Sequence, residues 1–520
     1  MAATLRRPTY VLGGNGQRTR GRAARTSNVR AGVAVANAVR TTLGPRGMDK
    51  MLVDAEGNVV VTNDGATILA EMDVEHPAAR MLVEVTGSQA KAVGDGTTTA
   101  AVLAGRLLAN AESLLENDVH PTAIVEGYAE AARLALDAVD AATLEGPTDD
   151  DLLRVAASSM TGKGTGDVTA DVLAERVVRA VRAVHGEERF DRDDVHVRAR
   201  AGASSAATEL IEGVVVDDEP LVEGTPRTVA DAAVAVVDAA VDLRTSAVDA
   251  AYAVESADQV TAALSAEDRE LRGYADALVD AGASVVFCTS DVADRVADHL
   301  ARAGVLAFEQ VSTDDARAVA RATGAAWLGT PADVEPDDLG HAERVRVDRF
   351  GDETSTVVEG GSATRAVTLL VRGGTSHVVE ELERAVSDAV DATVAALDGG
   401  VVPGAGSTEV AIAHRVRDGA RGVAGREQLA VEAFADAVET IPRTLAENAG
   451  TDAIDALVEL RATFEREGRA GVVAGGRTGR VGDPLEHGVL DPAAVKREAV
   501  TSATEAATTI LRIDDVVAAS

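Results

Sequence analysis

The segment Gly94–Ala100, Gly-Asp-Gly-Thr-Thr-Thr-Ala, constrains the fold of this chain more than any other segment. Apolar residues continue from it at helical spacing through Ala100, Leu103 and Leu107, which predicts a helix whose first turn carries the threonines. The first N–H groups of a helix have no partner within the helix and lie at the positive end of its dipole. Such a helix start can bind an anion, and phosphate suits it.

Asp95 stands between two glycines of this segment. Glycine has no Cβ and lets a ligand approach the backbone, and an aspartate beside phosphates can hold a hard cation such as Mg²⁺ through oxygen. The alternative is an Asp-Gly turn followed by a threonine-capped helix, which needs no ligand. These residues alone leave both interpretations open.

The length and composition predict several domains with unusual cores. A chain of 520 residues is too long for a single core, so we expect about two to four domains. Hydrophobic residues make up 46% of the chain but aromatic residues only 2%. The cores must therefore be built mainly from Val, Ala and Leu.

The charge of the chain is strongly negative, with a formal net charge of −35. Only four lysines occur, and nearly all the remaining positive charge is arginine. Excess acid with Arg in place of Lys is typical of a protein from a cytosol of very high salt, where charge repulsion is screened at short range. The acidity and the lack of aromatic residues argue against a nucleic-acid partner.

Further features limit the compartment and the chemistry. The single cysteine, Cys288, excludes an intrachain disulfide and a cysteine-based zinc site. No apolar run is long enough for a transmembrane helix, so we expect no membrane partner. Residues 1–28 are rich in Gly and Arg without an apolar stretch typical of a secretory signal. We expect an extended N-terminal arm and a cytoplasmic protein.

Two more loops of similar character precede Gly94. The helical pattern of residues 29–42 stops at Leu43–Gly47, whose Gly-Pro pair cannot continue a helix. A predicted β-hairpin, with strands at 51–53 and 59–61, then leads to Thr62–Gly65, which opens a short helix. Three turns with free backbone donors thus fall within a short part of the chain.

The middle of the chain has a different pattern. Short apolar strands alternate with acidic helices between about residues 195 and 357, which predicts an inserted α/β domain. After it, residues 377–397 show apolar residues at helical spacing.

Long motifs recur along essentially the whole chain, at residues 41–54, 61–65, 93–99, 159–164, 370–375, 425–430, 441–450 and 510–515. With these motifs the sequence resembles the group II chaperonins, which comprise the archaeal thermosome and its eukaryotic cytosolic relatives.

The resemblance implies a multi-domain α+β fold with a mainly helical, split equatorial ATPase domain, a small α/β intermediate domain and an α/β apical domain. A helical protrusion of the apical domain, at about residues 245–280, would form a built-in lid. Hinges are expected at Gly202 and at Gly360–Gly361. The implied boundaries are 1–146 and 399–520 for the equatorial domain, 147–208 and 359–398 for the intermediate domain, and 209–358 for the apical domain.

The implied activity is ATP hydrolysis that closes the lid over a double-ring chamber holding unfolded client proteins. The partners would be copies of this chain or sister subunits in stacked rings. The implied cofactors are ATP and Mg²⁺, with K⁺ as a further candidate.

The resemblance also assigns roles to individual residues. Asp95 would hold Mg²⁺, Asp64 and Asp388 would orient the attacking water, and Lys163 would sense the γ-phosphate. Read without the resemblance, Asp388 is a solvated acid on an acidic helix. The remaining nucleotide-binding positions are Thr42, Leu43, Gly44, Pro45, Gly96, Thr97, Thr98 and Thr99 at the phosphates, Gly404 in a second nucleotide loop, and Asp491 at the ribose.

Two stretches depart from the family pattern. The family's triple glycine is here Gly404-Ala405-Gly406 after Pro403, and residues 469–473 differ from the stretch that precedes the nucleotide in the family. These changes leave open a ring subunit with weak or no ATPase activity that binds or regulates substrate. A phosphotransferase is a further alternative, although no acceptor-site motif is visible.

Overall fold

The computed structural model describes residues 18–53, 57, 59–185, 192–242, 257–350, 353–361 and 366–517. The chain divides into two compact units. The first combines Met1–Lys163 with Asp391–Ser520, and the second is the continuous segment Gly164–Val390. The multi-domain α+β fold is confirmed, whereas the finer division into three domains stays a prediction.

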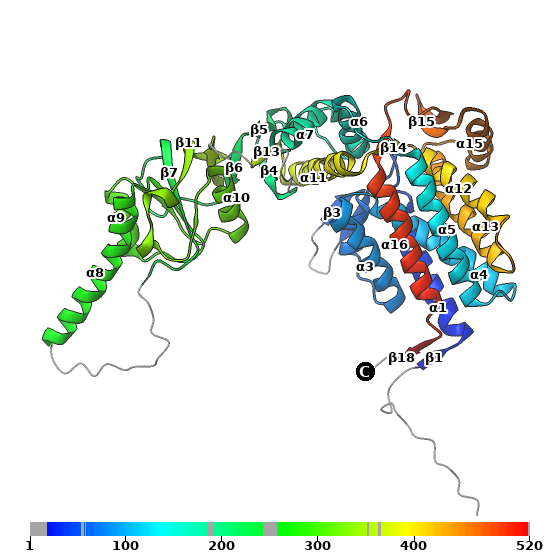
Figure 1. Cartoon of the computed structure of the whole chain (residues 1–520), viewed down its shortest axis with the longest axis horizontal. Coiled ribbons are helices and arrows are strands. Elements are labelled where there is room, and N and C mark those ends of the chain that lie inside the picture. The colour runs from blue at the N-terminus through cyan, green and yellow to red at the C-terminus, as the bar shows by residue number, and fades with distance from the viewer. Residues whose placement is uncertain are drawn as a thin grey trace, which may run out of the picture. The chain divides into compact units, whose positions relative to one another are not determined.

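The first unit is mainly helical, with its longest helices lying side by side (Figure 1). Pro121 occupies the first turn of α5, and Thr148 and Asp151 form a capping box at the start of α6, so local sequence sets both starts. Its helices are α1 (Arg22–Arg40), α2 (Gly65–Glu71), α3 (Pro77–Val93), α4 (Thr97–Glu116), α5 (Pro121–Ala142), α6 (Asp149–Met160), α12 (Ser407–Ala420), α13 (Glu427–Val438), α14 (Thr440–Asn448), α15 (Ala453–Glu467) and α16 (Ala493–Leu511).

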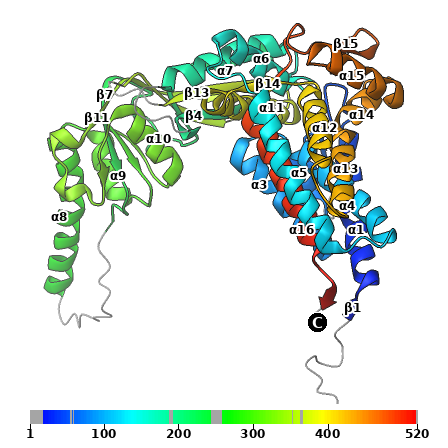
Figure 2. The same ribbon diagram turned by 45° about the vertical axis from the view of Figure 1, so that its right-hand side comes forward.

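Short antiparallel ribbons surround these helices. One of them joins segments from opposite ends of the chain, with Arg18 opposite Val517, and Figure 2 shows it at the foot of α1 and α16. In the part of the chain that the structure describes, each ribbon has two strands, so its edges are open there. The pairs are β1 (Arg18–Arg20) with β18 (Asp515–Val517), β2 (Lys50–Val53) with β3 (Val59–Thr62), β14 (Val401–Pro403) with β17 (Leu490–Pro492), and β15 (Gly471–Gly475) with β16 (Thr478–Gly482).

The second unit contains two sheets. One has the strand order β4-β13-β5, and the other has the order β6-β12-β11-β7-β8-β9 with β10 added beside β7. Helix α11 (Ser376–Gly399) begins in this unit and ends in the first. The remaining elements are α7 (Ala170–Val184), β4 (Val195–Ala201), β5 (Glu209–Ile211), β6 (Gly213–Val216), β7 (Thr228–Val237), α8 (Ala257–Ala281), β8 (Val285–Cys288), α9 (Asp294–Arg302), β9 (Leu306–Phe308), α10 (Thr313–Thr323), β10 (Trp327–Leu328), β11 (Gly340–Phe350), β12 (Glu353–Glu359) and β13 (Val367–Gly373), with short 3₁₀ turns at Arg192–Asp194, Ser205–Ala207, Pro331–Asp333 and Pro336–Asp338.

Both faces of the larger sheet are covered. Along β7, Val234 and Val236 belong to the core shared with α10, whereas Ala235 and Val237 belong to the core shared with α8 and α9. This alternation follows from the two-residue period of a strand. It explains why the strand is a continuous apolar run in the sequence.

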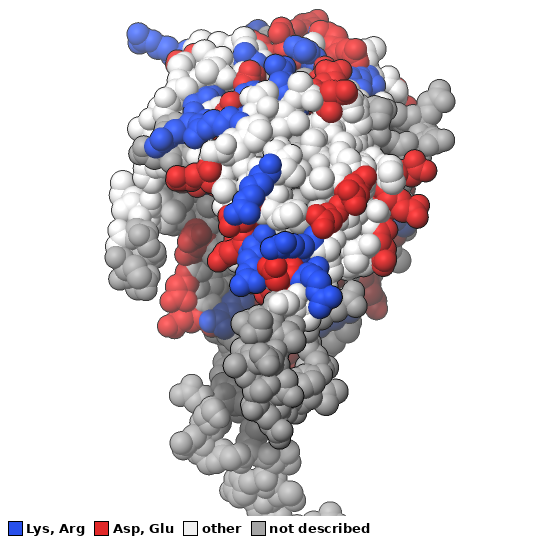
Figure 3. Space-filling model, turned by 90° about the vertical axis from the view of Figure 1, so that its left-hand side faces the viewer, with Lys and Arg blue, Asp and Glu red and all other residues white. Residues whose placement is uncertain are grey.

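The surface mixes charges of both signs. On the face shown in Figure 3, basic and acidic side chains are interspersed around a broad area that carries neither. Ion pairs also connect α8 to α9, where Asp268 lies 3.1 Å from Arg295, and they occur within α8, where Asp268 lies 2.9 Å from Arg272. None of the helices within the described ranges is long and apolar enough to cross a membrane.

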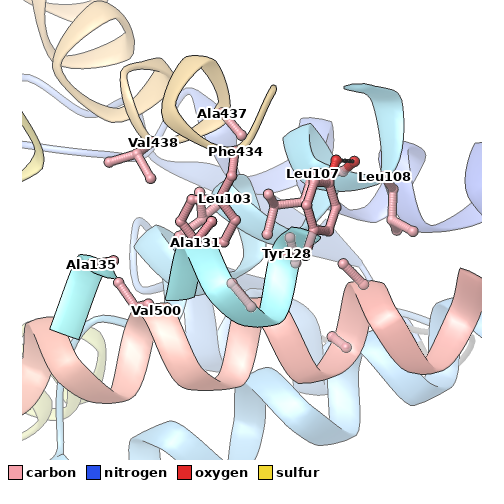
Figure 4. Close-up of a cluster of buried hydrophobic side chains, with 14 of the residues drawn as sticks. Leu103, Leu107, Leu108, Tyr128, Ala131, Ala135, Phe434, Ala437, Val438 and Val500 are labelled. Atoms are coloured by element: carbon pink, nitrogen blue, oxygen red, sulfur yellow. Dashed lines mark hydrogen bonds between the residues drawn. The ribbon is translucent and has the colours of Figure 1, made fainter. Parts of the chain in front are cut away.

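Helix α4 lies at the centre of the first unit and packs on α1, α3, α5, α13 and α16. Figure 4 shows its residues Leu103 and Leu107 beside Tyr128 and Phe434. The two rings meet edge to face with their centroids 5.8 Å apart, and the buried Tyr128 hydroxyl donates to the Leu107 carbonyl at 2.8 Å. That hydrogen bond satisfies a buried polar group in a core otherwise made of small aliphatic residues.

Small residues allow α1 and α4 to approach closely. A Cβ on Gly32 would lie 2.5 Å from Leu108 Cδ1, and a Cβ on Gly105 would overlap that of Ala36. A core poor in aromatic residues is thus filled by close helix packing. This packing holds the start of α4 fixed beneath the loops described next.

The N-terminal arm is shorter than the sequence predicted. Residues 22–28 are helical and extend α1, because Ala24 and Asn28 lie buried on the same face as Val29. Of the expected protrusion, the structure describes α8, and residues 245–256 lie outside the described ranges. Gly202 and Gly360 both have positive φ, 97° and 60°, but their role as hinges stays a prediction.

Candidate functional site

Loops that are distant in the sequence meet in the first unit. The Asn63 side chain donates to the Gly162 carbonyl at 2.7 Å. A Cβ on Gly162 would lie 3.0 Å from the Cα of Pro45. The predicted loops around Pro45, Asn63 and Lys163 are therefore one cluster.

The loop that opens α2 also packs against the start of α4. A Cβ on Gly65 would overlap the Thr98 hydroxyl and lie 3.1 Å from both Thr98 Cβ and Thr98 N. Only glycine fits at this position. The structure thus brings the loop that carries Asp64 next to the Gly94–Ala100 segment.

Helix α4 begins without a side-chain cap. Its N-cap residue is Gly96, in the left-handed region with φ 85°, and no side chain accepts a hydrogen bond from the first turn at that position. A Cβ on Gly96 would also overlap the Gln89 amide and lie 2.7 Å from Val495 Cγ1. A glycine rather than a threonine is thus the N-cap of α4, and the first-turn N–H groups remain suited to an anion.

Asp95 and Asp64 each use one carboxylate oxygen for local structure. Asp95 Oδ1 accepts from the Gly96 N–H at 2.6 Å, and Asp64 Oδ2 accepts from the backbone and hydroxyl of Thr67, both at 2.7 Å. Asp64 is thereby the N-cap of α2. Within the described ranges no residue donates to the second oxygen of either carboxylate, so each is oriented and has one oxygen for a ligand.

A metal held here would need ligands from outside the protein. No group of three or more His, Cys, Asp or Glu side chains with metal-binding geometry occurs in the described part of the chain. Mg²⁺ commonly uses one or two carboxylates together with phosphate oxygens and water, so Asp95 beside a phosphate site fits that ion.

The predicted second nucleotide loop has the same construction as the first. Gly406, with φ 79°, precedes α12 without a side-chain cap. A Cβ on Gly406 would lie 3.3 Å from Leu445 Cδ1, and a Cβ on Gly44 would overlap Leu445 Cδ2. Leu445 therefore lies against both the Gly404–Gly406 loop and the Leu43–Gly47 loop.

The two departures from the family pattern are in contact. Ala405 has φ 55°, a left-handed conformation that is unfavourable for a residue with a Cβ. Its carbonyl accepts from Val472 N at 2.8 Å, and a Cβ on Gly471 would lie 3.0 Å from the Ala405 Cβ. The methyl group of Ala405 is accommodated because residue 471 is glycine. The two altered stretches, 403–406 and 469–473, therefore form one continuous surface.

Asp491 lies on β17, next to Gly404 of the first altered stretch, and it pairs with Val402 of β14. A Cβ on Gly404 would lie 3.1 Å from Asp491 Oδ2, so the carboxylate covers the loop backbone. The Lys496 ammonium lies 2.7 Å from the same oxygen and 2.8 Å from Glu409 Oε1. Asp491 is thus bound by Lys496, a residue that the sequence interpretation did not select.

The remaining predicted residues differ in how far the structure places them. The buried Thr42 hydroxyl donates to the Val39 carbonyl at 2.9 Å, and the Leu43 carbonyl accepts from Asn448 at 2.8 Å, so both shape the loop. Lys163 is the last residue of the first unit before the chain enters the second. Asp388 belongs to the second unit, so its approach to the nucleotide loops stays a prediction.

Sequence interpretation missed several positioning residues. Gln89 is fully buried and donates to the Asp95 carbonyl at 3.0 Å. A Cβ on Gly94 would lie 2.7 Å from Asp391 Oδ2, which places a carboxylate of α11 beside the first loop. A glutamine inside an apolar helical face, and a lysine in a chain that otherwise uses arginine, were the available signals for Gln89 and Lys496.

Comparison with known proteins decides the family. The sequence model of the TCP-1/cpn60 chaperonin family matches residues 35–520. This chain belongs to the TCP-1/cpn60 chaperonin family. The chaperonin is 64% identical to thermosome subunit 3 of Haloferax volcanii over the whole of both chains.

More distant relatives of the chaperonin are also thermosome subunits. It is 48% identical to thermosome subunit alpha of Halobacterium salinarum, over 98% of this chain and 91% of the relative. It is 45% identical to thermosome subunit beta of Methanothermobacter thermautotrophicus, over 99% of this chain and 95% of the relative. The assignment to the group II chaperonins of a halophilic archaeon is confirmed, and the chain is a chaperonin subunit.

Proposed function

We propose that this chaperonin subunit binds and hydrolyses Mg-ATP and uses the hydrolysis to close a lid over unfolded protein. One observation carries the proposal. Two helices, α4 and α12, both begin at left-handed glycines without side-chain caps; both starts lie against the first turn of α16, through Val495 and Lys496, and Asp95 directly precedes the first of these glycines. Backbone donors, a dipole and a hard oxygen ligand together suit a magnesium-bound polyphosphate.

Phosphoanhydride hydrolysis depends mainly on positioning and on charge stabilisation. The first turns of α4 and α12 would hold phosphate oxygens, with Thr97–Thr99 and the Gly44–Pro45 backbone around them. Bound Mg²⁺ would neutralise phosphate charge, and Asp95 Oδ2 would be its protein ligand. Asp64, fixed by Thr67, would orient the attacking water.

The second unit would complete the site when it closes on the first. Asp388 would reach the water only in that state, and Lys163, at the junction of the two units, would report loss of the γ-phosphate. Binding and hydrolysis would then be separable, because the groups that hold the nucleotide lie on one unit and the proposed base lies on the other.

Open sheet edges support assembly with sister subunits. The β2–β3 ribbon exposes apolar side chains, with Met51 70% and Val53 62% exposed, and both of its edges are open in the described part of the chain. The β1–β18 ribbon is also two-stranded. Exposed edges and apolar side chains favour pairing with another chain, so we propose that the β2–β3 ribbon of one subunit adds to the β1–β18 ribbon of the next.

Client protein would bind the second unit. Its surface includes helix α8, the described part of the expected lid, and the face in Figure 3 presents a broad area without charged side chains. In a chain with a net charge of −35, an uncharged area can accept an unfolded polypeptide with less electrostatic repulsion.

A ring subunit with weak ATPase activity is the second candidate, and the left-handed Ala405 favours it. Steady-state ATP hydrolysis by the purified protein in molar KCl separates the two candidates. ATP turnover no faster than that of a buffer blank would support the subunit with weak or no ATPase activity.

The nucleotide site itself is tested with Asp95→Ala, measured by calorimetry with ATP in the presence and absence of Mg²⁺. We expect the variant to lose the gain in affinity that Mg²⁺ gives the wild type. Asp49 is an exposed acid that follows the Leu43–Gly47 loop, so Asp49→Ala is the matched control and should retain that gain. If Asp95→Ala keeps the wild-type affinity with Mg²⁺, the segment is only a helix start.

A further inference from the structure

Lys496, Glu409 and Asp491 form a charged cluster beside the second nucleotide loop. The Lys496 ammonium lies 2.8 Å from Glu409 Oε1 and 2.7 Å from Asp491 Oδ2. The side chains of Lys496 and Glu409 are only 11% and 5% exposed, whereas that of Asp491 is 28% exposed. Lys496 and Glu409 are therefore buried, whereas Asp491 is partly exposed beside the Gly404–Gly406 loop.

The buried lysine is charged. Burial by itself lowers the pKa of the Lys496 ammonium, but Asp491 and Glu409 outweigh that effect and raise it above its ordinary value. A buried ammonium between two carboxylates is costly to desolvate and gains little net stability over well-packed apolar residues. The cluster is therefore better suited to placing Asp491 than to stabilising the fold.

The backbone around the cluster leaves Asp491 little freedom. β17 pairs with β14, and the Gly404 N–H donates to the Val489 carbonyl at 3.0 Å, so the strand and the loop are joined on both sides of the carboxylate. Lys496 takes Oδ2, and within the described ranges no residue donates to Oδ1. The second oxygen can therefore accept a hydrogen bond from a hydroxyl group placed over the loop.

Glu409 orients the Lys496 side chain. It lies in the first turn of α12, where the helix dipole favours a negative charge, and its Oε2 is buried without a hydrogen-bond partner in the described part of the chain. The other carboxylate oxygen of Glu409, Oε1, accepts a hydrogen bond from the Lys496 ammonium. The α12 start and the Asp491 carboxylate are thus connected through one ammonium group.

We propose that Lys496, held by Glu409, is a positioning residue that fixes the Asp491 carboxylate so that its free oxygen selects the ribose hydroxyls of the nucleotide. This inference rests on the proposed ATP site. It predicts that the chain distinguishes ATP from ATP lacking one ribose hydroxyl, and that the distinction depends on two residues that do not touch the nucleotide.

The test compares ATP, 2′-deoxy-ATP and 3′-deoxy-ATP, by calorimetric Kd and by steady-state hydrolysis, in molar KCl with Mg²⁺. One hydrogen bond to a charged group corresponds to roughly a tenfold to hundredfold preference for ATP over one of the deoxy analogues. We expect that preference in the wild type. In Glu409→Met combined with Lys496→Met, which replaces the buried pair by apolar side chains of similar length, this preference should fall to about one.

Two further variants make the result specific. Lys496→Gln combined with Glu409→Gln keeps a neutral hydrogen-bonded pair, should fold if the methionine pair does not, and should also lose the preference. Arg497→Met removes the neighbouring cation of α16, which pairs with Asp140 at 2.8 Å, and should keep it. Circular dichroism verifies folding of each variant.

The outcomes separate this inference from the proposed function. A wild type that hydrolyses ATP without preferring it over either deoxy analogue overturns the inference and leaves the proposed function intact. The same conclusion follows if a folded double variant prefers ATP as strongly as the wild type does. A wild type that binds with the preference, and loses it in the double variants, but does not hydrolyse ATP supports the inference and refutes the proposed hydrolysis.

Discussion

Gly65, at the start of α2, lies so close to Thr98 of α4 that any side chain on it would overlap the Thr98 hydroxyl group. The residues come from two loops that are separated in the sequence by the whole of α3. Their contact brings the N-cap carboxylate Asp64 to the helix start that follows Asp95. The site depends on the absence of a side chain as much as on the carboxylates themselves.

We expect Gly65→Ala to weaken binding of Mg-ATP. The added methyl group must push Thr98 and the first turn of α4 away from α2, and a displacement of about 1 Å at a positioned site can cost on the order of a hundredfold. Calorimetry in molar KCl measures the affinity. Gly87→Ala, within α3, is the control, because a Cβ there meets nothing within 4 Å. Equal affinities for the two variants would show that α2 and α4 can separate without loss.

We expect Asp388→Ala to bind ATP normally and hardly hydrolyse it. Asp388 lies on the second unit, whereas the residues proposed to hold the nucleotide lie on the first, so its loss should lower kcat with little change in KM. The fall should be about 10²–10⁴-fold, the usual contribution of one general base. Glu380→Ala, an exposed acid on α11, is the control. Wild-type turnover in Asp388→Ala, with loss in Asp391→Ala instead, would transfer the role to the carboxylate beside Gly94.

We expect Ala405→Gly to stabilise the first unit. Ala405 has φ 55°, and glycine adopts this conformation without the penalty for a Cβ. Since glycine also loses more backbone entropy on folding, the net gain should be up to about 1 kcal/mol. Urea unfolding in molar KCl measures it. Ala411→Gly, inside α12, should instead destabilise by about 1 kcal/mol. A lower unfolding midpoint for Ala405→Gly would mean that the methyl group contributes packing that outweighs the strain.

We expect assembled rings to dissociate when salt is removed. The chain has 85 acidic and 50 basic residues, and ring closure brings these charges together. The screening length grows from about 3 Å in 1 M salt to about 10 Å in 0.1 M salt, so repulsion between subunits rises. Sedimentation velocity across that range of KCl should show large particles giving way to monomers. Rings that persist in 0.1 M KCl would contradict this expectation.

Sequence patterns predicted the features that depend on local order. Helix α11 was expected at 377–397 and spans Ser376–Gly399, and the hairpin around residues 51–61 forms β2 and β3, because burial on one face leaves a regular period in the sequence. The glycine-rich loops could also be recognised from local sequence, because left-handed turns favour glycine. The N-terminal extension of α1 was missed because its burial comes from other elements of the bundle.

The cluster around Asp491 could not be predicted in that way. Glu409 and Lys496 are separated by 87 residues and become neighbours only when β14 pairs with β17 and positions α12 against α16. No local pattern records such a contact. The coupling between Ala405 and Gly471 is hidden for the same reason, and sequence alone presented it as two unrelated changes.

The β1–β18 ribbon has a consequence for synthesis on the ribosome. The second unit is one continuous segment that ends at Val390, so it can fold while residues beyond it are still being made. The first unit cannot, because α4 packs on α16 and Arg18 pairs with Val517. Until those late residues leave the exit tunnel, α3, α4 and α5 lack the part of their packing that α16 supplies. Newly made subunits can therefore pass through a stage in which a folded second unit is attached to an unfinished first unit.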